Sequence, residues 1–290
     1  MTGSHGFAGR HLTSALAALD IETIASTADV RDGEAVARDM RAARPSGVAH
    51  LAAITSVADA WRREREVWDV NALGALNVTL AVAAHAPEAR LLIVSSAEVY
   101  GRVGGEEPVT EERAVAPVSP YGRAKAAAEL AAARDDLDVV IARPFPHTGP
   151  GQTEHFAIPS FAGQIARIEA GDAPPVIKVG NLASRRDYAD VRDVADAYAR
   201  LLKLRGGPRV VNVATGCAFS MSFILEQLLA RATRQITVEV DPSRLRPTDI
   251  PLLVGSPARL MEATGWRPIR PLDETLADVL EAARQGVTTP

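Results

Sequence analysis

The chain has 290 residues, of which 47% are hydrophobic and 23% are charged, and its formal net charge is −4. This size allows one large α/β domain or two smaller lobes, while the acidic balance argues against a nucleic-acid partner and the lack of an apolar run of about 18 residues argues against a membrane span. A single cysteine, Cys217, excludes an internal disulfide and suits a reducing cytoplasm, and the scattered histidines predict no metal site.

The first ten residues contain a glycine-rich turn. Gly3, Gly6 and Gly9 allow a tight turn and let backbone N–H groups approach a pyrophosphate at the start of a helix, which we expect over residues 11–19. Such a turn should follow a buried strand, yet only two residues precede it. We therefore expect either a start about five residues upstream or a first strand that is cut short.

The next segment is too short for two separate strands. Residues 22–25 predict a second strand, which runs almost at once into a helix that ends near residue 43. Dinucleotide folds often place an acid for the ribose, or a base for a 2′-phosphate, at the end of this strand. Here that place holds Ser26 and Thr27, so the choice between NAD and NADP stays open. Arg10 could serve a 2′-phosphate, with a solvated arginine as the alternative.

The middle of the chain alternates between strand and helix, as in a parallel sheet covered on both faces. Strands are predicted over 47–53, 91–96 and 139–145, and helices over 61–85 and 121–133. The strand over 47–53 ends in small residues that leave room for a ligand. The strand over 91–96 brings Ser95 and Ser96 to the ligand-facing edge of the sheet.

A tyrosine and a lysine stand four residues apart near the start of the second of these helices. Tyr121 and Lys125 therefore lie on one helix face, which places an ammonium beside a phenol. A cation about 4 Å away is worth roughly 4 kcal/mol at a dielectric of about 20, enough to lower the pKa of Tyr121 by up to about three units. A phenol that exchanges protons near neutral pH suits the interconversion of a carbonyl and an alcohol.

After residue 146 the composition changes to loops that are rich in turn-forming residues. Strands are predicted over 176–180 and 209–213, and helices over 191–202 and 272–284. We expect the late segments to form a small lobe over the carboxyl edge of the sheet. Arg244 and Arg246 in one loop, with Arg186 in another, could clamp a ligand that bears a phosphate, and solvent-exposed arginines are the alternative.

Together these motifs resemble the extended short-chain dehydrogenase/reductase superfamily. TGSHGFAG at 2–9, HLAA at 50–53, SSAEVYG at 95–101 and YGRAK at 121–125 follow the order and spacing of that family. The second half is similar to the GDP-4-keto-6-deoxy-D-mannose reductases, through RPFPHTGPGQ at 143–152, VGNLASRRDYADVRDV at 179–194 and RLRPTDIPLLVGS at 244–256.

The resemblance implies a Rossmann-like α/β fold with a doubly wound parallel sheet, a truncated first strand and a small C-terminal substrate-binding lobe. Residues 1–148 and about 182–216 would form the dinucleotide-binding domain, and about 149–181 and 217–290 the nucleotide-sugar-binding lobe. Members of this superfamily generally pair through two long helices. A homodimer through residues 61–85 and 122–133 is therefore expected.

The resemblance also implies roles for individual residues. Tyr121 would be the acid/base, Ser96 would hydrogen-bond the sugar oxygen, and Lys125 would hold the nicotinamide ribose. Glu98 would be the fourth catalytic residue. NAD(P)H would contact Gly3, Gly6, Phe7, Gly9, Asp29, Val30, Leu51, Ala52, Ala53, Tyr121 and Lys125. The GDP-sugar would contact Ser96, His147, Arg186, Arg246 and Asp249. Position 146 is proline where the family usually has asparagine, which leaves the substrate contacts open.

The implied activity is the NAD(P)H-dependent reduction of the C4 ketone of a GDP-4-keto-6-deoxy-hexose, of the type that yields GDP-rhamnose. A GDP-mannose 4,6-dehydratase is the alternative, because Glu98 stands where a dehydratase has its glutamate. A nucleotide-sugar 4-epimerase comes third. A dinucleotide-binding protein without catalysis is an alternative of another class, which the presence of both Tyr121 and Lys125 disfavours.

Overall fold

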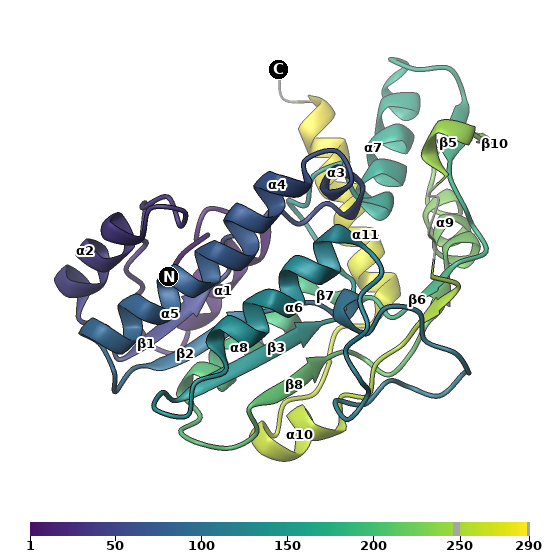
Figure 1. Ribbon diagram of the computed structural model, residues 1–290. Coiled ribbons are helices and arrows are strands. Elements are labelled where there is room, and N and C mark those ends of the chain that lie inside the picture. Colours follow the sequence, from purple (N-terminus) through teal and green to yellow (C-terminus); the bar gives the residue numbers. More distant parts are fainter. Residues whose placement is uncertain (246–249, 289–290) are drawn as a thin grey trace.

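The computed structural model describes residues 1–245 and 250–288, and its larger part is built on a parallel four-stranded sheet (Figure 1). The strand order is β1 (Gly47–His50), β2 (Arg90–Val94), β3 (Val139–Pro144) and β8 (Val210–Val213). These runs are almost entirely apolar because helices cover both faces of the sheet. The α/β fold with a parallel sheet is as predicted.

The register brings the carboxyl ends of the strands to one edge. His50 lies opposite Ile93, and Val94 lies opposite Ala142. The segments that follow β1, β2 and β3 therefore leave the sheet side by side, and they carry Leu51, Ala52, Ala53, Ser96, Glu98 and His147.

Two groups of helices bury the two faces of the sheet (Figure 1). On one face, Leu12 and Tyr198 pack with Leu92 and Val140 of the strands. On the other face, Val36 and Val82 pack with Leu91 and Ile141. The first group is α1 (Phe7–Ala17) and α8 (Val191–Lys203), and the second is α2 (Gly33–Ala43), α5 (Gly74–His85) and α6 (Pro120–Ala132).

The first strand is reduced to a single bridge, which confirms the predicted truncation. Thr2 donates its N–H to the carbonyl of Ala49 at 3.1 Å, and the Thr2 carbonyl accepts from the N–H of Leu51 at 3.3 Å. The predicted strand over residues 22–25 is wrong, because that segment is irregular. A strand forms only where a neighbouring strand supplies hydrogen-bond partners for its backbone groups. Residues 22–25 have only Met1 beside them, so no strand forms there.

The long helix predicted over 61–85 is interrupted near its start. Ser56 caps the short α3 (Val57–Ala60), the chain turns, and a continuous run then extends through α4 (Glu64–Val67), the π-helix η1 (Trp68–Leu73) and α5. Among the helices of the described residues, only the run Glu64–His85 is long and apolar enough to cross a membrane, judged by length and composition alone. An 18-residue window in it has a mean hydropathy of 1.4 and is 44% buried. Buried core helices share this length and hydropathy, and α5 packs on the sheet.

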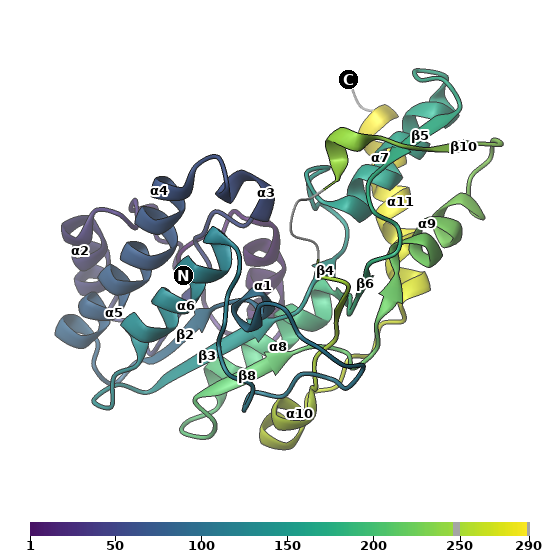
Figure 2. The ribbon, with the colours of Figure 1, turned by 45° about the vertical axis from the view of Figure 1, so that its right-hand side comes forward.

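The smaller lobe stands beside the sheet's carboxyl edge (Figure 2). Its core lies among the apolar faces of three helices, where Phe161, Ile224 and Leu276 are buried. The helices are α7 (Ala157–Ala170), α9 (Met221–Leu229) and α11 (Leu272–Thr288), and the parallel pair β5 (Val176–Val179) and β10 (Thr237–Val240) flanks them.

The remaining elements are short. They are η2 (Ala97–Tyr100), β4 (His147–Thr148), β6 (Arg185–Arg186), β7 (Ala189–Asp190), β9 (Phe219–Ser220), η3 (Pro242–Arg244), β11 (Leu252–Leu253) and α10 (Ala258–Thr264). Leu260 of α10 and Trp266 are fully buried in the same core as Leu12 and Tyr198. This part of the C-terminal region, which was predicted to belong to the lobe, therefore packs on the sheet domain.

Candidate active site

The glycine turn is packed so closely that side chains would not fit. Gly3 has a φ of +70°, and a Cβ atom there would lie 2.6 Å from the N of Ala52. A Cβ atom on Gly9 would lie 2.1 Å from the carbonyl oxygen of Gly3. Gly6 immediately precedes α1 and has no side chain to cap it, so the first N–H groups of the helix point out of the turn. This geometry forms a cradle of backbone donors for an anion.

Small residues line the loop that follows β1. Leu51, Ala52 and Ala53 are half-buried, and the loop beyond them is fixed by Asn71. The Asn71 side chain donates to the carbonyl of Ile54 at 3.0 Å and accepts from its N–H at 2.8 Å. Asn71 lies in η1, so the π-helix turns this amide toward the loop. The hydrogen bonds of Asn71 thus hold the end of this loop in place.

Asp29 and Val30 are positioned by α5. The side chain of Asn77 donates to the carbonyl of Val30 at 2.9 Å, and a Cβ atom on Gly74 would lie 2.7 Å from Val30 Cγ2. The carboxylate of Asp29 accepts from Arg31, and this hydrogen bond lowers the pKa of Asp29 to about 2. Both side chains of that ion pair are exposed.

Helix capping brings Ser96 and Tyr121 together. Ser96 caps η2, with its Oγ accepting from the N–H of Glu98 at 3.2 Å. Ser119 caps α6 and also donates to the carboxylate of Glu98 at 3.4 Å, so the start of α6 rests on η2. The side chain of Ser96 lies close enough to the phenol of Tyr121 to lower the tyrosine pKa. The two sequence motifs therefore converge on one point, with Glu98 nearby.

The electrostatics of Tyr121 differ from the prediction. Burial raises the pKa of Tyr121 to about 12, against the smaller opposite effect of the hydrogen bond with Ser96. The ammonium of Lys125 donates to the carbonyl of Val94 at 2.8 Å, and burial lowers the pKa of Lys125 to about 8. The predicted lowering of the Tyr121 pKa by Lys125 is wrong for this structure, because desolvation of the phenol outweighs the other influences on it.

A buried charge network beneath these residues escaped the sequence analysis. The carboxylate of Glu129 accepts from the hydroxyl of Ser95 at 2.5 Å and from two guanidinium nitrogens of Arg143 at 2.9 and 2.6 Å. Its charge acts on Lys125 to raise the lysine pKa, against the larger effect of burial. One feature of the sequence indicated this network, namely an acid four residues after Lys125 in a helix that is otherwise rich in alanine.

The loop after β3 is tied to the glycine turn. The ring of His147 lies nearly parallel to that of Phe7, with centroids 6.1 Å apart, and burial lowers the pKa of His147. Arg10 donates to the carbonyls of His5 and Gly151, at 2.8 and 3.2 Å. Arg10 thus bridges the two loops while it stays exposed to solvent.

Of the arginines predicted to bind the substrate, the structure describes Arg186 and Arg244. Arg186 lies in β6 and donates to the carbonyl of Arg185 at 2.9 Å. Arg244 donates to the hydroxyl of Ser160 at 3.2 Å. Arg246 and Asp249 lie outside the described residues, so the predicted clamp remains a prediction. Within residues 1–245 and 250–288, no cluster of three or more His, Cys, Asp or Glu side chains could hold a metal ion.

Comparisons of sequence give a consistent set of relatives. The family model described as GDP-mannose 4,6 dehydratase matches residues 20–279. The GDP-6-deoxy-D-mannose reductase of Pseudomonas aeruginosa is 34% identical over 289 residues, which cover 97% of this chain and 95% of the relative. The GDP-6-deoxy-D-talose 4-dehydrogenase of Aggregatibacter actinomycetemcomitans is 26% identical and covers 91% of this chain and 90% of its own.

Solved structures agree in fold over the whole chain. The structure of RMD from Pseudomonas aeruginosa with NADPH has a TM-score of 0.88 at 33% identity, and covers 98% of this chain and 97% of its own. The UDP-glucose 4-epimerase of Thermus thermophilus with NAD has a TM-score of 0.86 at 29% identity, and covers 98% and 97%. Both neighbours hold a nicotinamide cofactor.

Proposed function

The chain belongs to the family described as GDP-mannose 4,6 dehydratase, within the extended short-chain dehydrogenases/reductases, and from this membership we propose that it reduces the C4 ketone of a GDP-4-keto-6-deoxy-hexose with NAD(P)H. The observation that carries the proposal is the meeting of Ser96 and Tyr121, one helical turn from Lys125, at the sheet edge that also bears the glycine cradle. The name of the Pseudomonas aeruginosa relative supports a reductase.

The residues present fit a nicotinamide dinucleotide. The cradle at Gly3 and Gly9 excludes side chains and offers backbone N–H groups, as a pyrophosphate requires. Ala52 and Ala53 have small side chains that would line the cofactor site, and Asp29 would contact the adenosine part. Bound NAD(P)H supplies the hydride for the ketone. The NADPH-bound and NAD-bound neighbours support either cofactor, and both forms belong in the assay.

The protein's own contribution is the proton. Reduction of a ketone leaves charge on the carbonyl oxygen, which must receive a proton as the alcohol forms. The raised pKa of Tyr121 keeps its phenol protonated at neutral pH, so the donor is ready before the reaction starts. The Ser96 hydroxyl would hydrogen-bond the same oxygen. The ammonium of Lys125, one helical turn from Tyr121, would hold the nicotinamide ribose.

The lobe would hold the GDP part of the substrate. Arg186 lies in β6, and residues 244–245 lie where the chain enters the undescribed segment. Guanidinium groups bind phosphate oxygens in two-pronged geometry, which suits a diphosphate. We assign Arg186, Arg246 and Asp249 to this contact, and His147 to the sugar side, next to the loop tied to the glycine turn.

Direct turnover tests the proposal. The protein is incubated with GDP-4-keto-6-deoxymannose and with NADH or NADPH, and the sugar product is identified by NMR. We expect one molecule of reduced cofactor to be consumed for each hexose reduced. Turnover of GDP-mannose without net consumption of cofactor would show that the protein is a dehydratase and not a reductase.

That second candidate rests on Glu98. Its carboxylate is held by Ser119 and lies near the Tyr121 phenol, where its charge raises the tyrosine pKa. A dehydratase needs a base for the C5 proton, and Glu98 could supply one. Ala97, however, offers no acid for the departing water. The same stoichiometry assay separates the two reactions.

We also assign the protein to the cytoplasm as a homodimer. Apolar side chains stay exposed along η1, α5 and α6, which lie next to one another (Figure 1). They are Trp68, Leu73, Leu76, Leu80 and Leu130. A second copy would cover these side chains. The exposed free thiol of Cys217 suits a reducing compartment.

A further inference from the structure

Three residues of α6 that are one turn apart meet the end of β2 at consecutive positions. The ammonium of Lys125 donates to the last carbonyl of β2 at 2.8 Å, and the carboxylate of Glu129 accepts from the hydroxyl of Ser95 at 2.5 Å. One residue further, Ser96 lies close to the phenol of Tyr121. Residues four apart share a helix face, so these three side chains form one stripe along α6. The stripe seats the helix on the ligand-facing end of the strand.

Glu129 is the most firmly held member of this stripe. Its carboxylate accepts from Nε and Nη2 of Arg143 in β3, at 2.9 and 2.6 Å, in addition to the hydroxyl of Ser95. Arg143 also donates to the hydroxyl of Tyr100 at 3.1 Å, and that hydroxyl donates to the side chain of Asn212 at 2.6 Å. Glu129 is 7% exposed and Arg143 is 5% exposed. The carboxylate is therefore fixed from β2 and β3 and is nearly shielded from water.

Glu129 serves two buried cations. A buried ion pair is a poor device for stability alone, because apolar side chains of similar volume hold a core without the cost of desolvating two charges. Here a third charge belongs to the same site. Lys125 is 5% exposed, and the charge of Glu129 raises the lysine pKa, while burial lowers it by more. Without the carboxylate, Lys125 and Arg143 would lose the anion that they share.

The other ionisable groups nearest to Lys125 do not take the place of Glu129. His50 in β1 is neutral at pH 7, because burial and the charge of Lys125 lower its pKa to about 3. Tyr121 is neutral as well, since burial raises its pKa to about 12. The charge of Glu98 in η2 acts on the phenol of Tyr121. The counter-charge of the ammonium is therefore the carboxylate one turn further along α6.

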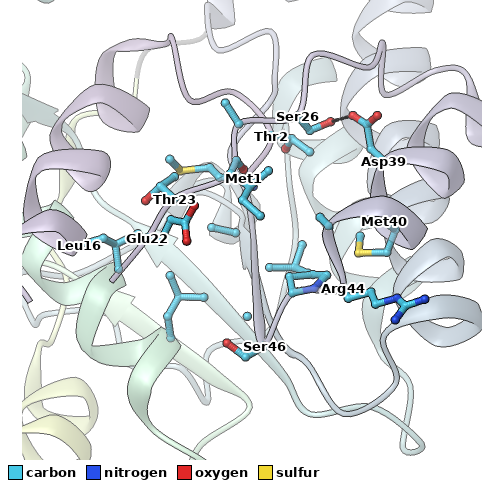
Figure 3. Close-up of a pocket in the computed structure, with 18 of the residues that line it drawn as sticks. Met1, Thr2, Leu16, Glu22, Thr23, Ser26, Asp39, Met40, Arg44 and Ser46 are labelled. Carbon is cyan, nitrogen blue, oxygen red and sulfur yellow. Dashed lines mark hydrogen bonds between the residues drawn. The ribbon is translucent and has the colours of Figure 1, made fainter. Parts of the chain in front are cut away.

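The remaining charges around α6 and β1 are exposed in part or belong to another site. On α3, α4, η1 and α5, the charged or titratable residues are at least partly exposed, namely Asp59, Glu64, Arg65, Glu66, Asp69 and His85. A cavity of about 840 Å³ lies at the free edge of β1, and Figure 3 shows Glu22, Asp39 and Arg44 among the residues that line it. Neither Lys125 nor Glu129 lines this cavity. The cavity and its charged groups are thus separate from the ammonium.

We propose that Glu129 is a positioning residue, whose carboxylate keeps Lys125 an ammonium and holds it at the end of β2. Arg143 and Ser95 fix the carboxylate, so that the counter-charge stays in place. Glu129 acts through Lys125 and not on the substrate. The consequence for catalysis rests on the proposed function, in which the ammonium holds the nicotinamide ribose. The relation between the two charges does not rest on it.

The titration of Lys125 can be followed directly, because the chain has three lysines and the other two, Lys178 and Lys203, are exposed. The protein is labelled with lysine that carries carbon-13 at Cε, and the Cε shifts are recorded by NMR from about pH 6 to about pH 11. The titration midpoint of Lys125 is compared in wild type, in Glu129→Gln and in Glu111→Gln. The first variant keeps the shape of the side chain and loses its charge.

Glu111→Gln is the matched control. The side chain of Glu111 is 3% exposed and accepts from the N–H of Asn212 at 2.7 Å, at the far end of the same polar network. The control therefore removes a buried carboxylate from the network and leaves Glu129 beside Lys125. A role in core stability alone would affect both variants in the same way.

Glu129→Gln should lower the midpoint of Lys125 from near pH 8 by about one pH unit or more, because a neighbouring negative charge favours the ammonium. Glu111→Gln should leave the midpoint unchanged. In the reductase assay, the alkaline limb of the kcat/KM profile should move to lower pH together with the Lys125 midpoint, since this profile reports groups of the free enzyme.

An unchanged Lys125 midpoint in Glu129→Gln would overturn the proposal. An equal shift in Glu111→Gln would do the same, because it would mean a general loosening of the core. Where Glu129→Gln does not fold, the double variant Glu129→Gln, Arg143→Gln removes both charges of the pair, which folded proteins tolerate better than the loss of one partner. The same lowering is expected there, and its absence counts equally against the proposal.

The two readouts separate this role from the proposed function. A lowered midpoint in a protein that does not reduce GDP-4-keto-6-deoxymannose would support the action of Glu129 on Lys125 and remove the reductase. A lowered midpoint in an active reductase whose kcat/KM profile stays in place would overturn the positioning role.

Discussion

Replacing Lys125 by methionine should stabilise the fold while it removes the proposed activity. The lysine side chain is buried, and burial lowers its pKa from the ordinary 10.5 to about 8. Methionine has a similar length and carries no charge, so the variant removes the cost of burying an ammonium. It also removes the hydrogen bond to Val94, which offsets part of the gain by about 1 to 2 kcal/mol at pH 7.

The sign of the pH dependence follows from the two protonation states. The unfolded chain keeps the lysine proton up to about pH 10.5, whereas the folded chain releases it near pH 8. Between these values the unfolded state binds more protons, so this group's contribution to stability rises with pH. Linkage gives a rise of about 2 to 3 kcal/mol from pH 7 to pH 10, and the methionine variant lacks this rise.

Urea unfolding of both proteins at pH 7, 8, 9 and 10 provides the measurement. The quantity of interest is the difference in unfolding free energy between wild type and Lys125→Met at each pH, because the titration of other groups cancels in it. Lys178→Met is the control for the loss of one lysine, since the side chain of Lys178 is exposed. We expect the difference for that control to stay flat with pH.

A flat difference for Lys125→Met would refute the reasoning. It would mean that the lysine is hydrated in the folded state, or that another group neutralises it. A decrease of several kcal/mol in the unfolding free energy of Lys125→Met at pH 7 would also refute it, because the hydrogen bond to Val94 would then outweigh the cost of burying the charge.

Four further substitutions test the site and the dimer. Tyr121→Phe should reduce kcat by about 10²-fold or more and leave the Kd for NADPH unchanged by calorimetry, and turnover near the wild-type level would remove the acid/base assignment. Gly9→Ala should abolish NADPH binding, because its Cβ would lie 2.1 Å from the carbonyl oxygen of Gly3. The control Gly6→Ala, whose Cβ would lie 3.2 Å from the same oxygen, should bind NADPH within about tenfold of wild type. Equal NADPH affinities for the two variants would argue against the cradle. Leu76→Asp should convert a dimer into a monomer by light scattering, and an unchanged mass would place the interface elsewhere.

Local patterns were enough to predict the main elements and the reaction class. The spacing of Gly3, Gly6 and Gly9, and of Tyr121 and Lys125, reflects steric and helical constraints that act within a few residues. The apolar runs of β1, β2, β3 and β8 are equally local. These features support the family, and the comparisons confirm it.

Predictions that needed a distant partner fared worse. Residues 22–25 have the composition of a strand, yet they form none, because a strand needs a neighbour and Met1 supplies a single residue. The pairing of Glu129 with Ser95 and Arg143 joins residues that are 34 and 14 positions apart, so no short pattern marks it.

The sequence by itself determined which groups are available and which of them share a turn of helix or a strand end, since covalent spacing and backbone geometry decide that. Only the tertiary structure decided the protonation of those groups. Burial raises the pKa of Tyr121 and directs Lys125 to a carbonyl 31 residues away, because desolvation depends on everything packed around a side chain and not on its neighbours along the chain.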